Sequence, residues 1–261
     1  IQYFGRGGLN PFSFLVGLSA TLGLAWIAWR NPASASQQAR LEITAGLWAL
    51  GGALIGARLV YVAFNWSAFQ STPWNTIQIW SGGLTWTGGL AGAVIGLAAY
   101  AWINSQSVGE LEDALLPLWL MVITGVWMAN WRIGIAYGVP APRDAWWAVP
   151  AVDEWGTTLP RLPLQPAAAL INLILFASLD QCKKWFKHPG TASLFAFLGL
   201  NLQMIAISVL RADPGPSWNE LHLETWAAIG FSVLSLLLLL IIRSGALAKG
   251  TDVENHKSES I

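Results

Sequence analysis

Seven stretches of this chain are apolar over lengths that reach or approach the thickness of a lipid bilayer. A helix needs about 20 mostly apolar residues to cross the hydrocarbon core. The stretches cover residues 11–29, 43–64, 84–103, 113–137, 166–179, 192–210 and 225–242. The fifth is short, and it lengthens only by taking in Asp180 and its neighbours. We therefore predict an all-α membrane protein with about seven transmembrane helices.

The composition argues against a water-soluble domain. Only 11% of the 261 residues are charged, against roughly 25% in an average soluble domain. The formal net charge of +0 gives no electrostatic basis for a nucleic-acid partner. One cysteine and three dispersed histidines argue against a disulfide framework and a metal site, and we expect no metal and no cofactor. The chain starts at Ile1 rather than Met, so a signal peptide cannot be judged.

The Lys and Arg residues between the stretches set the expected orientation, because cytoplasmic loops carry an excess of them. One group follows the first, third and fifth stretches or lies near the C-terminus: Arg30, Arg40, Lys183, Lys184, Lys187, Arg243, Lys249 and Lys257. The other side has only Arg6, Arg143, Arg161 and Arg211. This bias predicts that the N-terminus is outside and the C-terminus is cytoplasmic.

We expect a single transmembrane domain over residues 1–243 and a polar, disordered cytoplasmic tail over residues 244–261. The longest connection, residues 138–165, falls on the outer side between the fourth and fifth stretches and is rich in Pro and Trp. Two interpretations of this segment stay open. It is either a small structured cap that contacts substrate or an ordinary loop that tryptophans anchor at the headgroups.

Two arginines lie inside apolar stretches, Arg58 in the second and Arg132 near the outer end of the fourth. Charge within a span is energetically costly and is a functional-site hypothesis by default. One alternative is structural, in which the guanidinium reaches the headgroups or pairs with a backbone carbonyl. The other is that the two guanidinium groups bind a lipid phosphate through their paired N–H donors.

Glycines line one face of the third stretch, in the sequence GGLTWTGGLAG at residues 82–92. Gly88, Gly92 and Gly96 recur every fourth residue, so this face has no side chains and lets a helix or a lipid approach the backbone. The pairs Gly82–Gly83 and Gly88–Gly89, which bracket Thr85 and Thr87, predict a backbone that bends as it enters the bilayer. The glycines expected to line this lipid groove or packing face are Gly83, Gly88, Gly89 and Gly92.

Five segments, in order along residues 56–213, resemble motifs of the bacterial prolipoprotein diacylglyceryl transferases. GARLVYVAF is similar to G-x-R-x-x-Y-V-x-F, and GGLTWTGGLAG to G-G-(L/M)-S-F-H-G-G-L-x-G. EDALLP, RLPLQP and LRADP are similar to D-x-x-x-P, R-H-P-x-Q and F-F-R-x-P-D. Members of this family have seven spans and move a diacylglyceryl group from phosphatidylglycerol to the lipobox cysteine of a prolipoprotein. The resemblance implies a bacterial inner-membrane protein whose site faces the outer leaflet, with phosphate-binding residues Arg58, Asn130, Arg161, Gln165 and Arg211.

The chain departs from the family pattern at the positions of several reactive groups. Thr87 stands in place of the family histidine, and Leu162 in place of the histidine of R-H-P-x-Q. A hydroxyl without a neighbouring base does not accept a proton from a thiol at neutral pH, so Thr87 is expected to be inert. Further along, Met204 and Ser208 take the places of an arginine and a glutamate.

The register of the family motif G-R-x-G-N-F-x-N-G-E stays open. Without gaps, Asn130 matches, while Trp127 replaces the arginine and Ile135 replaces the glutamate. With a shift of five residues, Arg132 takes the arginine position and the asparagine and glutamate are missing. The two registers place the guanidinium on different helix faces, because five residues turn about 500°.

These departures favour a lipid-binding, non-catalytic scaffold or complex subunit, whose partners would be other membrane subunits. The alternative is an active, divergent transferase with Arg132 or Arg143 as the catalytic cation and a prolipoprotein as substrate. A small transporter or channel is a third hypothesis. The spans are expected to lack the broken helices and acidic relays that such proteins use.

Overall fold

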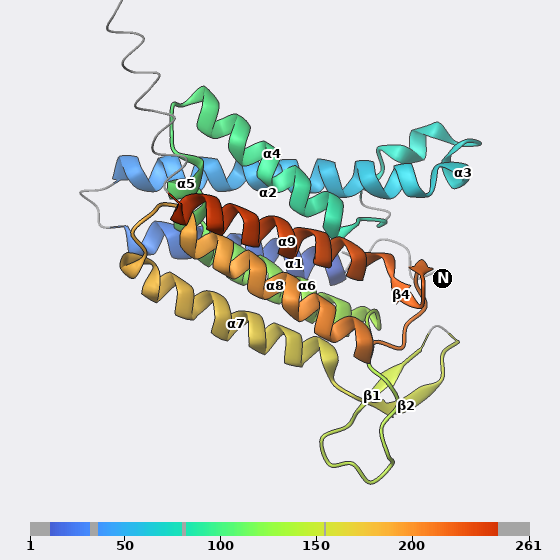
Figure 1. Cartoon of the computed structure of the whole chain (residues 1–261). Helices are drawn as coiled ribbons and strands as arrows, with labels where there is room; N and C mark the ends of the chain where they lie inside the picture. The colour runs from blue at the N-terminus through green and yellow to red at the C-terminus, as the bar shows by residue number, and fades with distance from the viewer. Residues whose placement is uncertain (1–10, 32–35, 80–81, 154, 245–261) are drawn as a thin grey trace, which may run out of the picture.

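The computed structural model describes residues 11–31, 36–79, 82–153 and 155–244, and most of them are helical (Figure 1). The long helices are α1 (Pro11–Arg30), α2 (Ser36–Phe64), α4 (Trp86–Ile103), α6 (Leu116–Ile133), α7 (Leu164–Cys182), α8 (Thr191–Leu210) and α9 (Leu223–Arg243). The shorter elements are α3 (Trp66–Phe69), η2 (Pro73–Thr76), α5 (Val108–Ala114), β1 (Val149–Val152), β2 (Thr158–Arg161), η4 (Lys183–Trp185), β3 (Ser217–Trp218) and β4 (Leu221–His222). The predicted tail lies outside the described residues from position 245 onward, as does Arg6.

Six of the described helices are long and apolar enough to cross a membrane, which confirms the all-α membrane fold. Helices α5 and α6 form a further segment of this kind, bent by 57°. The predicted stretch 113–137 corresponds to the last residues of α5 and to α6, with the bend between them. Pro117, in the first turn of α6, has no N–H with which to continue the backbone ladder of α5.

Helix α7 extends beyond the predicted stretch 166–179, to Cys182. Its last turn includes Asp180, whose carboxylate pairs with Arg30 at 3.1 Å and with Lys183 at 3.0 Å. These two cations compensate the acidic group, so the helix continues through it.

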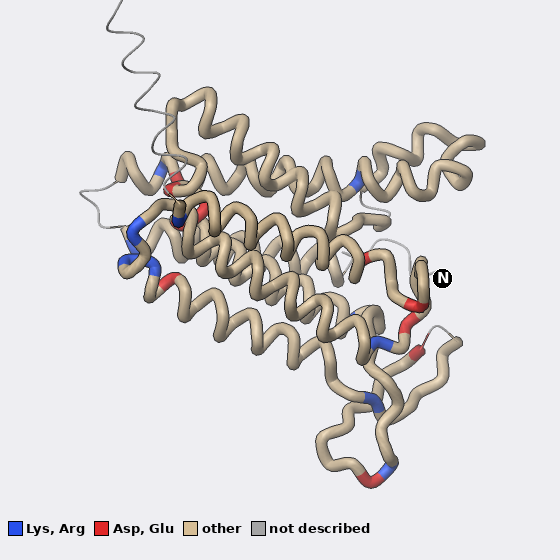
Figure 2. Tube along the Cα trace, in the orientation of Figure 1, with Lys and Arg blue, Asp and Glu red and all other residues tan. Residues whose placement is uncertain are grey.

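Two contacts show which helix ends lie together. The ends of α1 and α7 meet at the Arg30–Asp180 ion pair, and Gly109 in the first turn of α5 touches Gly190 at the start of α8. Most charged residues gather at the two ends of the bundle (Figure 2). The end that faces the cytoplasm stays a prediction.

Glycines bring α2 and α4 together until their backbones touch. A methyl group at Gly92 would overlap the carbonyl of Gly52, and one at Gly88 would overlap the carbonyl of Gly56. Of the two occupants expected for this glycine face, a helix or a lipid, the structure has a helix. Gly82 and Gly83 have φ angles of +86° and +77°, so the chain turns before α4 as predicted, whereas the second pair, Gly88–Gly89, lies within helix α4.

The other long helices also pack in pairs: α1 contacts α6, α6 contacts α7, and α8 contacts α9. Close approach again involves glycine, because Gly125 of α6 faces the side chain of Ser19 on α1. A core of Ile27, Leu97 and Leu118 fills the centre between α1, α4 and α6. The ends of these helices position the groups of the candidate site.

The connection over residues 138–165 has an ordered hairpin that extends from one end of the bundle (Figure 1). Strands β1 and β2 pair antiparallel, with Val149 opposite Arg161. Isolated bridges join Gly138 to Arg211 and Pro140 to Arg161. The hairpin is therefore fastened to the helix ends, while its placement on the outer side and any contact with substrate stay predictions.

Candidate functional site

Arg58 lies near the end of α2 and is only 5% exposed. Its Nε donates to the carbonyl of Thr76 at 2.9 Å, and its Nη2 donates to the carbonyl of Asn75 at 2.6 Å. Nη1 donates to the carbonyls of Gly82 and Gly83. Four of the five guanidinium N–H groups thus hold the connection between α2 and α4. This geometry matches the carbonyl-pairing alternative and leaves one N–H group for a lipid phosphate.

Arg161 ends strand β2 and is buried. Its guanidinium donates to the carboxylate of Asp153 at 3.3 Å and to the carbonyl of Gly138 at 3.3 Å, and its carbon lies 4.4 Å from the centre of the Tyr137 ring. The other carboxylate oxygen of Asp153 accepts backbone N–H groups of the hairpin turn. Arg161 therefore joins the hairpin to the end of α6. Nearby, Gln165 donates from Nε2 to the carbonyl of Ile135 at 2.9 Å.

Arg211 follows the last residue of α8 and is held by two carboxylates. Its Nε and Nη2 donate to Asp213 at 2.8 and 2.7 Å, and its Nη1 donates to Glu224 at 2.8 Å. Burial acts to lower the pKa of the guanidinium, but hydrogen bonds and the charges of both acids outweigh burial and raise it. Arg211 is a permanent cation inside an acidic clamp.

Arg132 differs from these three arginines, because it is exposed in the last turn of α6. Its side chain has no hydrogen bond or ion pair with any residue that the structure describes. Helix α6 ends at Gly134, which adopts a left-handed φ of +71°. Asn130, two residues before Arg132, is half-buried, and its backbone carbonyl accepts the N–H group of Ile135.

The α4 end of the predicted site is occupied by packing contacts. Thr87 is half-buried, with no hydroxyl hydrogen bond to the described residues. A methyl group at Gly83 would meet the Tyr61 ring, whereas one at Gly89 would lie 3.6 Å from the Cβ of Ala57. Gly88 and Gly92 face α2, so the predicted glycine set lies mainly against protein.

Sequence reasoning considered charges in the spans and missed their buried amides. Asn172 in α7 is fully buried, and neither polar atom of its amide has a partner among the described residues. Gln203 in α8 donates to the carbonyl of Ala168 at 2.8 Å, one helical turn from Asn172. The sequence feature that could have identified both residues is an amide side chain within an apolar stretch. No group of three or more His, Cys, Asp or Glu side chains suits a metal ion in the described ranges.

The structure thus brings Arg161, Gln165 and Arg211 to one end of the bundle, where α6 and α8 finish. The backbone N–H of Val139 donates to Leu210 at 3.0 Å, which fastens these two helix ends together. Arg58 and Thr87 belong to the separate α2–α4 contact. Among the described residues, this end has two uncompensated cations, Arg132 on α6 and Arg143 in the hairpin connection, beside arginines that are already paired.

Comparisons with known proteins agree on one family. The family model for prolipoprotein diacylglyceryl transferase matches residues 8–241 of this chain. The phosphatidylglycerol–prolipoprotein diacylglyceryl transferase of Rhodospirillum centenum is 38% identical over 176 residues, 63% of this chain and 61% of that relative. Proteins of the same name from Agrobacterium fabrum and Rhodospirillum rubrum are 30% and 32% identical over 202 and 207 residues. These matches cover 74% and 76% of this chain and 69% and 71% of the relatives.

Proposed function

We propose that this chain, which belongs to the prolipoprotein diacylglyceryl transferase family, keeps the family's membrane scaffold and binds phospholipid without transferring a diacylglyceryl group. The observation that carries the proposal is the internal pairing of three arginines. Arg58 is directed at backbone carbonyls, Arg161 at Asp153, and Arg211 at two carboxylates. These are the cations that the family resemblance assigns to the lipid phosphate.

The pairing weakens the electrostatic part of the family reaction. A glycerol phosphate leaving group needs cations that are free to stabilise its growing charge. At Arg161 or Arg211, a phosphate has to displace carboxylates that are themselves partly buried, and an unpaired buried charge is strongly destabilising. The loss of one such contact typically slows a reaction by about 10²–10³.

The position of Thr87 weakens the proton-transfer part of the reaction. The nucleophile of the family is a cysteine thiol, which reacts as its thiolate. Thr87 has a hydroxyl with no described hydrogen-bond partner, and a hydroxyl is not a base at neutral pH. The presence of Thr87 at this position therefore supports the proposal that the protein does not catalyse the transfer.

Arg132 is the residue that we assign to lipid binding. Its exposed guanidinium, at the end of a membrane-spanning helix, lies where a phospholipid phosphate would be accessible. The relatives' names specify phosphatidylglycerol, so we take this lipid as the ligand, bound in the outer leaflet.

The test measures transfer and binding separately. Purified protein is given phosphatidylglycerol with a labelled diacylglyceryl group and a lipobox peptide, with the Agrobacterium fabrum relative as the positive control. We expect no labelled peptide. Native mass spectrometry with phosphatidylglycerol should show bound lipid, reduced in Arg132→Gln and unchanged in the control Arg40→Gln, which changes an exposed arginine at the start of α2. Labelled peptide overturns the non-catalytic proposal, and equal lipid binding by both variants overturns the assignment of Arg132.

An active, divergent transferase remains the second candidate, because Arg132 is free to stabilise a phosphate. His222, the last residue of β4 and the residue before α9, lies at the same end and is the candidate base. If transfer is detected, this alternative expects its loss in both Arg132→Ala and His222→Ala. Transfer that survives both substitutions contradicts these roles.

A further inference from the structure

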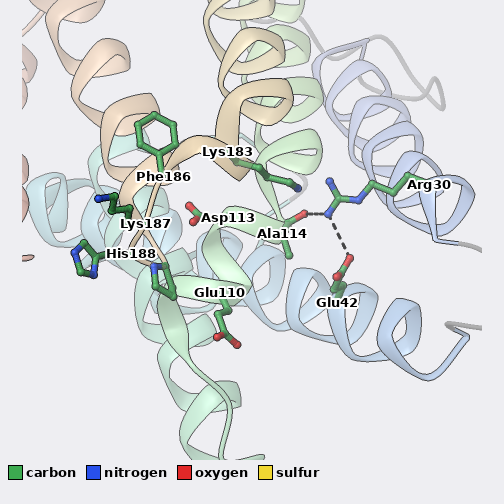
Figure 3. A pocket seen from close by; sticks show the side chains of 10 residues that line it. Arg30, Glu42, Glu110, Asp113, Ala114, Lys183, Phe186, Lys187 and His188 are labelled. Atoms are coloured by element: carbon green, nitrogen blue, oxygen red, sulfur yellow. Dashed lines mark hydrogen bonds and ion pairs between the residues drawn. The ribbon is translucent and has the colours of Figure 1, made fainter. Parts of the chain in front are cut away.

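A pocket of about 290 Å³ lies at the end of the bundle opposite the hairpin (Figure 3). It is formed where α1 ends, α2 begins, α5 passes and η4 leads into α8. Its lining is Arg30, Glu42, Glu110, Asp113, Ala114, Lys183, Phe186, Lys187, His188 and Pro189. The family resemblance places no site here, so its charges need their own explanation.

One part of this lining is an internally balanced set of charges. Arg30 donates to Glu42 at 3.3 Å, to Asp180 at 3.1 Å and to the carbonyl of Ala114. Lys183 donates to Asp180 at 3.0 Å. Two cations thus face two carboxylates, and this set stabilises the meeting point of α1, α2 and α7.

Asp113 is also engaged within the chain. Its carboxylate accepts the backbone N–H groups of Gly190 at 2.8 Å and Ser193 at 2.9 Å, together with the Ser193 hydroxyl. It therefore caps the first turn of α8, where a negative charge is favourable.

Three titratable side chains of the lining remain unengaged. Glu110, Lys187 and His188 are exposed, and none of them has an ion pair or side-chain hydrogen bond with the described residues. In Figure 3, Lys187 and His188 lie on one side of the pocket and Arg30 and Glu42 on the other. The pocket therefore presents an anionic and a cationic group that are not satisfied by each other.

The pocket lies at the depth of lipid headgroups. Its walls are the ends of segments long and apolar enough to span the membrane, and polar headgroups begin where such segments end. Trp185, next to the lining residue Phe186, is 74% exposed. An exposed indole at a span end is typical of the membrane–water boundary.

We propose that this pocket binds a phosphoethanolamine group, the headgroup of an aminophospholipid. Lys187 and His188 would hold the phosphate, and Glu110 would accept hydrogen bonds from the primary ammonium. A purely anionic headgroup is disfavoured by Glu110, and a purely cationic ligand by Lys187 and the neighbouring Lys183. A quaternary choline ammonium has no N–H to donate to Glu110. The volume is at the lower end for ligand pockets, about 300 Å³, which suits a headgroup without its acyl chains.

The proposal is tested by native mass spectrometry of the full chain with dihexanoyl phosphatidylethanolamine, phosphatidylcholine and phosphatidylglycerol. We expect phosphatidylethanolamine to bind most tightly. Glu110→Gln should weaken its binding about two- to fivefold, the effect of one exposed ion pair, and reduce its preference over phosphatidylcholine. Lys187→Gln should weaken phosphatidylethanolamine binding by a similar factor. Lys184→Gln is the matched control, since Lys184 is exposed on the same segment but does not line the pocket.

Soluble O-phosphoethanolamine distinguishes the two sources of this group. Competition with the lipid, sensitive to Glu110→Gln, supports a site that recognises the headgroup and receives it from the bilayer. Binding of the soluble compound without lipid binding supports the pocket but assigns it a soluble ligand. Equal affinity for the three lipids, or binding that is unaffected by both pocket substitutions, overturns the proposal. The measurements are made in the Arg132→Gln background, so that lipid held at the end of α6 is not counted with lipid in this pocket, and none of them depends on transferase activity.

Discussion

The backbone contact between α2 and α4 gives a direct test of the packing, through the substitution Gly92→Ala. The added Cβ would lie 2.8 Å from the carbonyl carbon of Gly52 and 3.0 Å from the Cα of Gly56. Carbon atoms pack at about 3.5–4.0 Å, so α4 has to move from α2 by roughly 0.7 Å or more. A gap of about this size loses a quarter to a half of each dispersion contact. We expect the free energy of unfolding to fall by about 2–3 kcal/mol, the upper part of the range for overpacking.

Gly51→Ala is the matched control, since it lies on α2 one residue before Gly52 and a Cβ there meets nothing within 4 Å. Alanine is favoured over glycine in a helix by up to about 1 kcal/mol. The same chemical change is therefore expected to have opposite signs at Gly92 and at Gly51. The loss at Gly92 corresponds to a Tm lower by about 5–10 °C for a chain of this size.

The assay is thermal unfolding of the purified proteins in one detergent, followed by far-ultraviolet circular dichroism after size-exclusion chromatography. A lower unfolding temperature for Gly92→Ala than for Gly51→Ala supports the close contact of the helix backbones. If Gly92→Ala and Gly51→Ala unfold at the same temperature, the steric reasoning is refuted, whether both are unchanged or both are destabilised.

Three further substitutions test other parts of the molecule by the same unfolding measurement. Arg211→Gln should lower the free energy of unfolding by about 3–5 kcal/mol because two carboxylates lose their cation, and a change no larger than that of Arg143→Gln would contradict the clamp. Arg132→Gln should change stability by less than about 0.5 kcal/mol, as expected for a surface side chain, and a larger loss would show an unrecognised structural contact. Asn172→Leu should raise stability by about 1–3 kcal/mol by removing two unpaired buried polar atoms, whereas a decrease would show that the amide is satisfied by buried water.

The spans and the glycine face were predictable from the sequence because their causes are local. Apolar length is set by bilayer thickness, and a four-residue glycine spacing appears on one helix face. The break before α6 also has a local cause, because Pro117 lies in the motif EDALLP, although apolar length alone predicts one continuous stretch there. The hairpin over Val149–Val152 and Thr158–Arg161 was expected only as an unspecified cap, since short strands depend on pairing across a turn.

The roles of the arginines were not predictable, because their partners are determined by the fold. Arg58 donates to carbonyls 17 to 25 residues away, and backbone carbonyls carry no signature in the sequence. Asp213, by contrast, is two residues from Arg211 and was the one clamp partner that a local search would find. The pocket could not be predicted from the sequence at all, because Arg30 and Asp180 are 150 positions apart.

The pairing of Arg30 with Asp180 bears on the order in which the protein assembles during synthesis. Helix α1 emerges first, and Glu42, only 12 residues after Arg30, is the first carboxylate that this cation meets. Asp180 arrives much later, on α7, whose segment has the lowest mean hydropathy of the six candidate spans, 1.2. When the weakly apolar α7 segment enters the membrane, the cation that pairs with its Asp180 is therefore already present on α1. Insertion of α7 should therefore be cooperative with α1, even though three membrane segments are made between them.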